Sequence, residues 1–177
     1  MAGKAKISSC PFTMFRRSIW HSKRFASLPN DAARYLYIYF LTHPQQTSTG
    51  CFRLTAPHAL ADLAAMTGAD WTAANYEAGR AAIIKNELIL ADDETHELLI
   101  TRWWQDNGPT NEDWFNGVRK YCEAIKSPSL RAAAQDALGV CWQAFLTSKL
   151  PSIPRGASEP TPFPTAADRL NALGNKR

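Results

Sequence analysis

The order of the elements predicted between residues 28 and 103 constrains the fold more than any other feature of this chain. Apolar periodicity, capping residues and turn residues divide this stretch into helices and strands. In chain order they are a helix at residues 28–43, a strand at 50–54, two helices at 55–67 and 70–86, and two strands at 87–91 and 97–102. A domain built this way is mainly α-helical, with a small β-hairpin at its end.

The first predicted helix follows a start signal at residues 28–31, with proline in its first turn. Its residues Tyr35, Leu36, Tyr39 and Phe40 recur at helical spacing, which predicts one buried face. Pro44 ends the helix because proline removes a backbone donor and clashes with the preceding turn.

Two further helices follow in close succession. Thr55 and Pro57 are typical of a helix start, Gly68 of a helix end, and Asp70 of an N-cap for the next helix. After that helix, Asp92 and Asp93 supply the turn residues of a hairpin. The order helix, strand, helix, helix, strand, strand is that of a winged helix-turn-helix, which we expect at residues 27–104.

The remainder of the chain divides into two parts. Residues 110–147 carry apolar side chains at i, i+3 and i+4 spacing and predict a pair of amphipathic C-terminal helices. These helices pack on the winged unit, on each other or on a second copy of the chain, and the sequence leaves this open. Residues 148–177 include five prolines between positions 150 and 165, so we expect a linker or a disordered tail there.

Charge is distributed unevenly along the chain, whose formal net charge is +4. Residues 1–26 hold six basic and no acidic side chains, and we treat them as a basic N-terminal arm. Residues 27–147 hold nine basic and fourteen acidic side chains, and residues 148–177 hold five and two. Basic arms are the usual footprint of phosphate contact, whereas an acidic middle is unusual in a DNA-binding protein.

The arm offers the first candidate DNA contacts. If Arg16, Arg17, Lys23 and Arg24 each neutralised a phosphate, log affinity would fall against log salt with a slope of about −3.6. The alternative is a solvated basic tail. Arg53, on the first strand, is a weaker phosphate candidate.

The helix predicted at residues 70–86 offers the second set of candidate DNA contacts. It would be the second helix of the helix-turn-helix, which presents its N-terminal residues to the bases. This points to Trp71, Thr72 and Asn75, with Lys85 near a phosphate. An asparagine that pairs with adenine contributes roughly 1–3 kcal/mol of discrimination. Alternatively, Trp71 packs at a subunit contact and Asn75 is merely solvated.

For two other features, the acidic hairpin and a pair of tryptophans, the sequence allows either a structural role or a binding role. The acidic hairpin residues, Asp92, Asp93, Glu94 and Glu97, either face solvent or contact a basic partner or the arm of another copy. The adjacent residues Trp103 and Trp104 either stack on bases or close the core, and we expect at least one of them in the core.

No enzyme motif stands out. The sequence has no phosphate-cradling glycine loop, nucleophile elbow or zinc motif, and its four histidines and four scattered cysteines lack metal-ligand spacing. We therefore expect no catalytic residues, metal or cofactor. No apolar run approaches the roughly 18 residues of a membrane span, and no secretory signal is evident, which favours a cytoplasmic protein with reduced thiols.

Residues 20–130 resemble the N-terminal winged-helix domain of phage and prophage replication initiation proteins, also called replisome organisers. The resemblance lies in apolar and turn residues of the segments 20–25, 33–44, 50–54, 83–89, 99–107 and 125–130. It implies binding to double-stranded DNA at an origin and recruitment of a host replicative helicase or its loader, in the cytoplasm or nucleoid of a bacterial host. Relatives often carry a separate helicase-binding domain, whereas here two helices and a proline-rich tail follow.

Three functions are therefore weighed. The first is a DNA-binding protein of phage origin that acts in replication initiation, as a monomer or a homo-oligomer. The second is a protein-interaction module that keeps the winged fold without touching DNA. The third is a winged-helix transcription regulator, which only the identity of the bound site would separate from the first.

Overall fold

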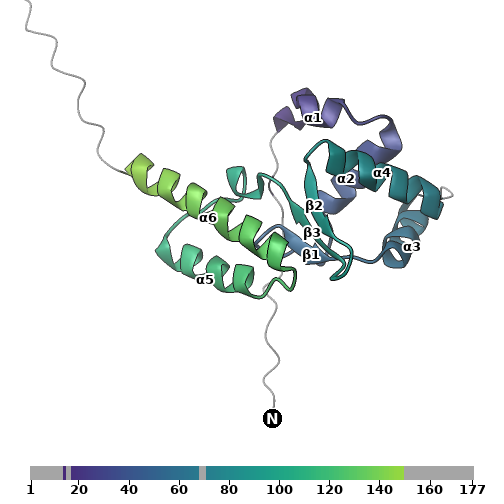
Figure 1. Ribbon diagram of the computed structural model, residues 1–177. Coiled ribbons are helices and arrows are strands. Elements are labelled where there is room, and N and C mark those ends of the chain that lie inside the picture. The colour runs from purple at the N-terminus through teal and green to yellow at the C-terminus, as the bar shows by residue number, and fades with distance from the viewer. Residues whose placement is uncertain (1–13, 15–16, 68–70, 150–177) are drawn as a thin grey trace, which may run out of the picture. The chain divides into compact units, whose positions relative to one another are not determined.

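The computed structural model describes residue 14, residues 17–67 and residues 71–149. Contacts divide the chain into two units, Met1–Leu146 and Thr147–Arg177, and almost all described residues belong to the first. Figure 1 shows the elements, which in chain order are η1 Arg17–His21, α1 Lys23–Ala26, α2 Asp31–Leu41, β1 Cys51–Arg53, α3 Ala56–Thr67, α4 Ala73–Lys85, β2 Ile89–Asp92, β3 Glu97–Ile100, η2 Trp103–Gln105, α5 Glu112–Glu123 and α6 Pro128–Lys149. The expectation of a mainly helical fold with little β-structure is confirmed.

Helix α2 is shorter than predicted and turned slightly about its axis. Asn30 caps it by accepting a hydrogen bond from the backbone N–H of Ala33 at 2.9 Å, so Pro29 precedes the helix instead of lying in its first turn. Tyr37 is buried, while Tyr35 is 36% exposed. The prediction that Tyr35 is buried was wrong. Tyr37, which the predicted face did not include, is buried because α1 covers a further side of α2, where the Phe25 ring lies 6.0 Å from that of Tyr37.

Helices α2 and α4 pack closely, and a glycine makes this possible. A Cβ at Gly79 would lie 3.1 Å from Cδ2 of Leu36 and 3.8 Å from Cα of Ala33. A larger side chain at this position would therefore require Leu36 to move. Tyr76 and Ile83 lie on the same buried side of α4 and extend the contact.

The sheet has three antiparallel strands in the order β1-β3-β2, so the predicted hairpin of β2 and β3 gains a third strand. Phe52 of β1 lies opposite Leu98 of β3, and Ile89 of β2 lies opposite Ile100. Asp92 Oδ1 accepts hydrogen bonds from the backbone N–H groups of the next turn, as the turn prediction requires. The sheet thus joins residues about 45 positions apart in sequence by pairing β1 with β3.

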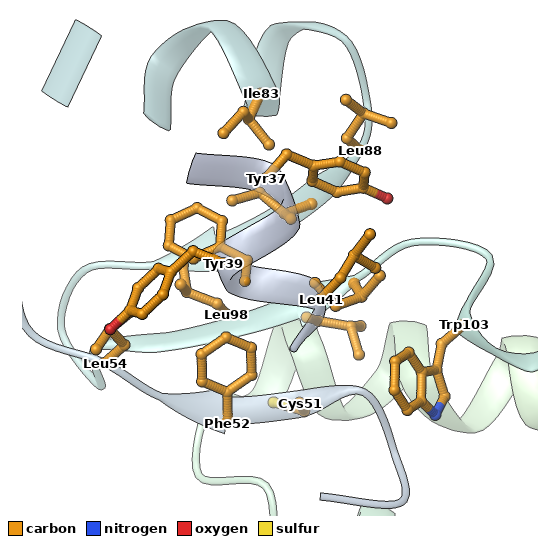
Figure 2. Packing of buried hydrophobic residues seen from close by; sticks show 14 of the residues in the cluster. Tyr37, Tyr39, Leu41, Cys51, Phe52, Leu54, Ile83, Leu88, Leu98 and Trp103 are labelled. Carbon is orange, nitrogen blue, oxygen red and sulfur yellow. The ribbon is translucent and has the colours of Figure 1, made fainter. Parts of the chain in front are cut away.

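The loop before β1 packs against the side chain of Trp103. Gly50 has a φ of +74°, and a Cβ there would lie 2.5 Å from the ring of Trp103. The Trp103 ring nitrogen donates a hydrogen bond to the Ser48 carbonyl at 2.9 Å. Figure 2 shows the Trp103 ring beside β1, with Phe52 and Leu41 in the same core. Trp103 and Trp104 are both buried, which confirms the expectation that at least one of them lies in the core.

Helices α5 and α6 pack both on the sheet domain and on each other. Asn111 caps α5 by accepting from the Trp114 N–H at 2.7 Å. Val118, Leu130 and Leu138 are buried in the same core cluster as α2 and the sheet, and the Phe115 and Trp142 rings stack at 4.5 Å. Among the described residues, no helix has the length and apolar character needed to cross a membrane.

Candidate nucleic-acid interface

The start of α4 differs from its prediction. Thr72, not Asp70, is the N-cap: its hydroxyl oxygen accepts a hydrogen bond from the backbone N–H of Asn75 at 3.2 Å. Asp70 lies outside the described residues. Trp71 therefore precedes the helix, and its half-buried ring packs against that of Tyr35 at 6.4 Å between centroids. Thr72 remains exposed, but its hydroxyl is used to cap the helix.

The outward face of α4 keeps the residues that were predicted to meet DNA. Asn75 and Lys85 are exposed, and the side chain of neither has a partner among the described residues. Between them the face consists mainly of alanine. Arg80, the other cation of α4, pairs with Glu77 at 3.9 Å and with Asp93 of the hairpin turn. The outward face of α4 therefore carries mostly small side chains and little net charge.

The stretch from Arg17 to Ala26, called the basic segment below, is the part of the basic arm that packs on the domain. Phe25 of α1 and Leu28 are 2% exposed, and they anchor the segment in the core. Arg17 and Lys23 lie on its exposed surface, without a partner among the described residues. Arg16 lies outside the described residues. The described part of the segment therefore presents two exposed cations, Arg17 and Lys23.

Arg24 is placed differently from its neighbours. Its Nη1 donates to the backbone carbonyl of Glu87 and, at 3.3 Å, to the hydroxyl of Thr101. Burial, and secondly the nearby Arg102, lower the pKa of Arg24 below its usual value. Arg24 thus has a structural contact that the sequence did not indicate.

Arg53 is exposed at the end of β1, opposite Glu97 of β3. It lines a cavity of about 390 Å³ together with His43, His58 and Asp62. Arg53 is therefore accessible to a ligand. No described residue of the basic segment lines this cavity, so Arg53 and the basic segment do not share it.

The buried residues Tyr39 and His43 and the half-exposed Asp62 form a polar network that joins α2 to α3. The Tyr39 hydroxyl donates to Asp62 Oδ2 at 2.8 Å, and burial together with this bond raises the pKa of Tyr39. His43 stacks on Phe52 at 4.9 Å, and its Nδ1 accepts from the Gln45 N–H at 3.2 Å. Burial lowers the pKa of His43 although Asp62 acts in the opposite direction. The hydrogen bond between Tyr39 and Asp62 ties α3 to α2 and helps to orient it.

The acidic hairpin is built into the fold. Glu97 is buried, and its two carboxylate oxygens accept from the backbone N–H groups of Lys126 at 3.0 Å and Ser127 at 2.7 Å, just before α6. Asp92 accepts from the Ser127 hydroxyl. Of the four acids, only Glu94 is exposed without an ion pair among the described residues. Neither alternative predicted for the hairpin included this internal role.

Sequence reasoning missed Arg102 altogether. The last strand was predicted to continue to this residue, but β3 ends at Ile100, and Arg102 adopts a left-handed conformation with φ of 56°. Glycine and asparagine are the residues typical of this conformation, so an arginine gives no local signal of it. The side chain of Arg102 lies near Arg24.

Comparisons of this chain with protein-family models, with curated proteins and with solved structures find no match. Among residues 17–67 and 71–149, no three histidine, cysteine, aspartate or glutamate side chains are grouped so that they could hold a metal ion.

Proposed function

We propose that this chain is a winged-helix DNA-binding protein. The observation that carries the proposal is the element order from α2 to β3, combined with the strand order β1-β3-β2. In this arrangement α4 is the second helix of a helix-turn-helix and would lie in the major groove. Its exposed Asn75 and Lys85 are available for a base and a phosphate, respectively.

The basic segment supports the same proposal. Arg17 and Lys23 can contribute sequence-independent affinity through phosphate neutralisation, which depends strongly on salt. Three acids of the hairpin, Asp92, Asp93 and Glu97, have partners within the fold, and Asp93 is paired with the cation of Arg80. The hairpin would accordingly contribute little to DNA contact.

Within this class we propose a role in phage or prophage replication initiation in a bacterial cytoplasm. The support is the resemblance of residues 20–130 to replication initiation proteins, which bind an origin and recruit a helicase or its loader. A transcription regulator with the same domain would use the same contacts. Helices α5 and α6 would offer the surface for a protein partner or a second copy.

The proposal is tested by fluorescence anisotropy of the full chain on duplex fragments that tile its genomic neighbourhood, at two salt concentrations and with excess random DNA. We expect one fragment to bind in the presence of competitor. A fragment at an origin would favour replication, and one at a promoter would favour regulation. Absence of binding to every fragment would reject the proposal.

A matched pair of variants tests the proposed role of α4. Asn75→Ala should weaken binding to the preferred fragment by roughly 1–3 kcal/mol, while Asn116→Ala, an exposed asparagine of α5, should not. Binding to random DNA should change little in both variants. Equal specificity in Asn75→Ala and the wild type would remove α4 from base recognition.

A protein-interaction module is the second candidate function, and the nearly neutral outward face of α4 favours it. Such a module would leave DNA unbound and would retain a partner through this face or through α5 and α6. The same anisotropy series separates the two functions.

A further inference from the structure

A cavity of about 340 Å³ lies between the basic segment and the end of the sheet. From one side Ser18, His21, Ser22 and Arg24 line it, and from the other Thr101 and Arg102 do so. Its floor includes buried aromatic side chains such as Tyr37 and Trp103. Arg24 and Arg102, almost 80 positions apart in sequence, thus line one pocket together with buried aromatic residues.

One nitrogen of the Arg24 guanidinium, Nη1, makes all the hydrogen bonds of this side chain to the described residues. Nη1 donates to the Glu87 carbonyl and to the Thr101 hydroxyl, which fixes the plane of the group. Nε and Nη2 have no partner among the described residues. An arginine carries five N–H donors in a fixed fork, so three of them remain available to a ligand.

Arg102 is brought to the same cavity by an unusual backbone. Its φ of 56° places it in the left-handed region, a conformation that is unfavourable for an arginine and persists only where the surroundings impose it. Its side chain is exposed and has no hydrogen bond or ion pair with a described residue. Strained positions of this kind gather at ligand sites.

The two guanidinium groups repel each other in the absence of a ligand, as the lowered pKa of Arg24 reflects after the larger effect of burial. Among the described lining residues two arginines face one carboxylate, that of Asp106, so the described lining keeps a net positive charge, while Glu87, outside the lining, attracts Arg24. An anion between Arg24 and Arg102 would replace this repulsion by attraction on both sides. Tetrahedral phosphate oxygens match the fork of arginine and accept its hydrogen bonds in pairs.

We propose that this cavity binds a phosphate group, with Arg24 and Arg102 as its two cationic donors. The phosphate belongs either to a free nucleotide or to the DNA backbone. Only the second source rests on the function proposed above. In that case the pocket would be a fixed phosphate contact beside the exposed Arg17 and Lys23.

The first experiment titrates the full chain with inorganic pyrophosphate and with 5′-dAMP, without DNA, by isothermal calorimetry at low salt. Arg102→Gln is the main variant because its side chain supports no other described residue. It should weaken binding about tenfold or more, the effect of losing charge-assisted hydrogen bonds. Arg119→Gln, an exposed arginine of α5, is the matched control and should change binding less than about twofold.

Arg24→Gln is a second variant, and its folding is checked by circular dichroism because Arg24 also holds Glu87. No binding of pyrophosphate or 5′-dAMP to the wild type would overturn the proposal. Equal binding by Arg102→Gln and the wild type would also overturn it. Neither result would bear on DNA binding through α4, which is measured separately.

The second experiment identifies the source of the phosphate. Pyrophosphate is added to the wild-type chain bound to duplex DNA, with Arg102→Gln in parallel. If pyrophosphate displaces DNA from the wild type and not from the variant, the pocket holds a backbone phosphate. If it binds without displacing DNA, the pocket serves a free nucleotide.

Discussion

The hairpin of β2 and β3 and the basic segment from Arg17 to Ala26 use their charges in opposite ways. The hairpin acids are engaged inside the fold: Glu97 receives two backbone N–H groups next to α6, and Asp92 receives the Ser127 hydroxyl. Within the basic segment, Arg17 and Lys23 remain exposed and unpaired among the described residues. A count of charges along the sequence therefore does not show which side chains are free to contact a partner, because three of the four hairpin acids have partners within the fold.

Among the variants that test this comparison, we expect the largest loss of stability from a substitution of Glu97. Glu97→Ala removes both acceptors of the N–H groups of Lys126 and Ser127, and it should lower the free energy of unfolding by about 3 kcal/mol. Glu94→Ala, on the exposed turn, should change it by less than about 0.5 kcal/mol. Urea denaturation measures both. Equal losses in the two variants would show that the hairpin acids are not structural.

Arg24 and Lys23 sharpen the comparison within the basic segment. Arg24→Gln loses the bond to the Glu87 carbonyl and should cost roughly 1–2 kcal/mol of stability. Lys23→Gln, one position earlier and exposed, should leave stability within about 0.5 kcal/mol of wild type. Urea denaturation of the two variants tests this difference, and identical stabilities would place Arg24 among the solvated bases.

Acid should weaken the hairpin before it affects the basic segment. The Ser127 hydroxyl, followed by the backbone N–H of Thr95, holds the pKa of Asp92 below its ordinary value of 3.8. A carboxyl with a depressed folded-state pKa contributes stability above 3.8, and this contribution is lost as pH falls through the folded-state pKa. Unfolding free energies measured from pH 6 to pH 2.5 should fall less steeply below pH 4 in Asp92→Asn than in wild type. Parallel curves would contradict this role.

The smallest expected effect concerns the ion pair between Arg80 and Asp93. The Asp93 side chain is 84% exposed, so screening by water limits the contribution of the pair. Asp93→Asn should cost no more than about 0.5 kcal/mol of stability in urea denaturation. A loss as large as that of Glu97→Ala would mean that the turn, and not the α6 contact, stabilises the hairpin.

The sequence predicted the helices and strands well because their signals are local. Alternating and helical periodicity, with Pro44 and the Asp92 turn, placed all the main elements within a few residues. The orientation of α2 was less predictable: Tyr37 is buried by Phe25, which comes from another element. Periodicity within one helix cannot reveal how many neighbours cover it.

The candidate site was predictable only in part, for the same reason. The sequence predicted that Lys23, Asn75 and Lys85 are available to a partner, and all three side chains are exposed. The pairing of Arg24 with Glu87 and the approach of Arg102 depend on tertiary contacts across more than 60 residues. The role of Glu97 likewise depends on the start of α6, 30 residues later.

The most direct test of the account is the salt dependence of DNA affinity in a double variant of the basic segment. Arg17→Gln with Lys23→Gln should reduce the magnitude of the slope of log affinity against log salt by about 1.8, at about 0.9 for each phosphate contact. The matched pair Arg119→Gln with Lys120→Gln, both exposed on α5, should leave it unchanged. An unchanged slope in the first variant would contradict the claim that the free bases of this segment, unlike the engaged hairpin acids, face the partner.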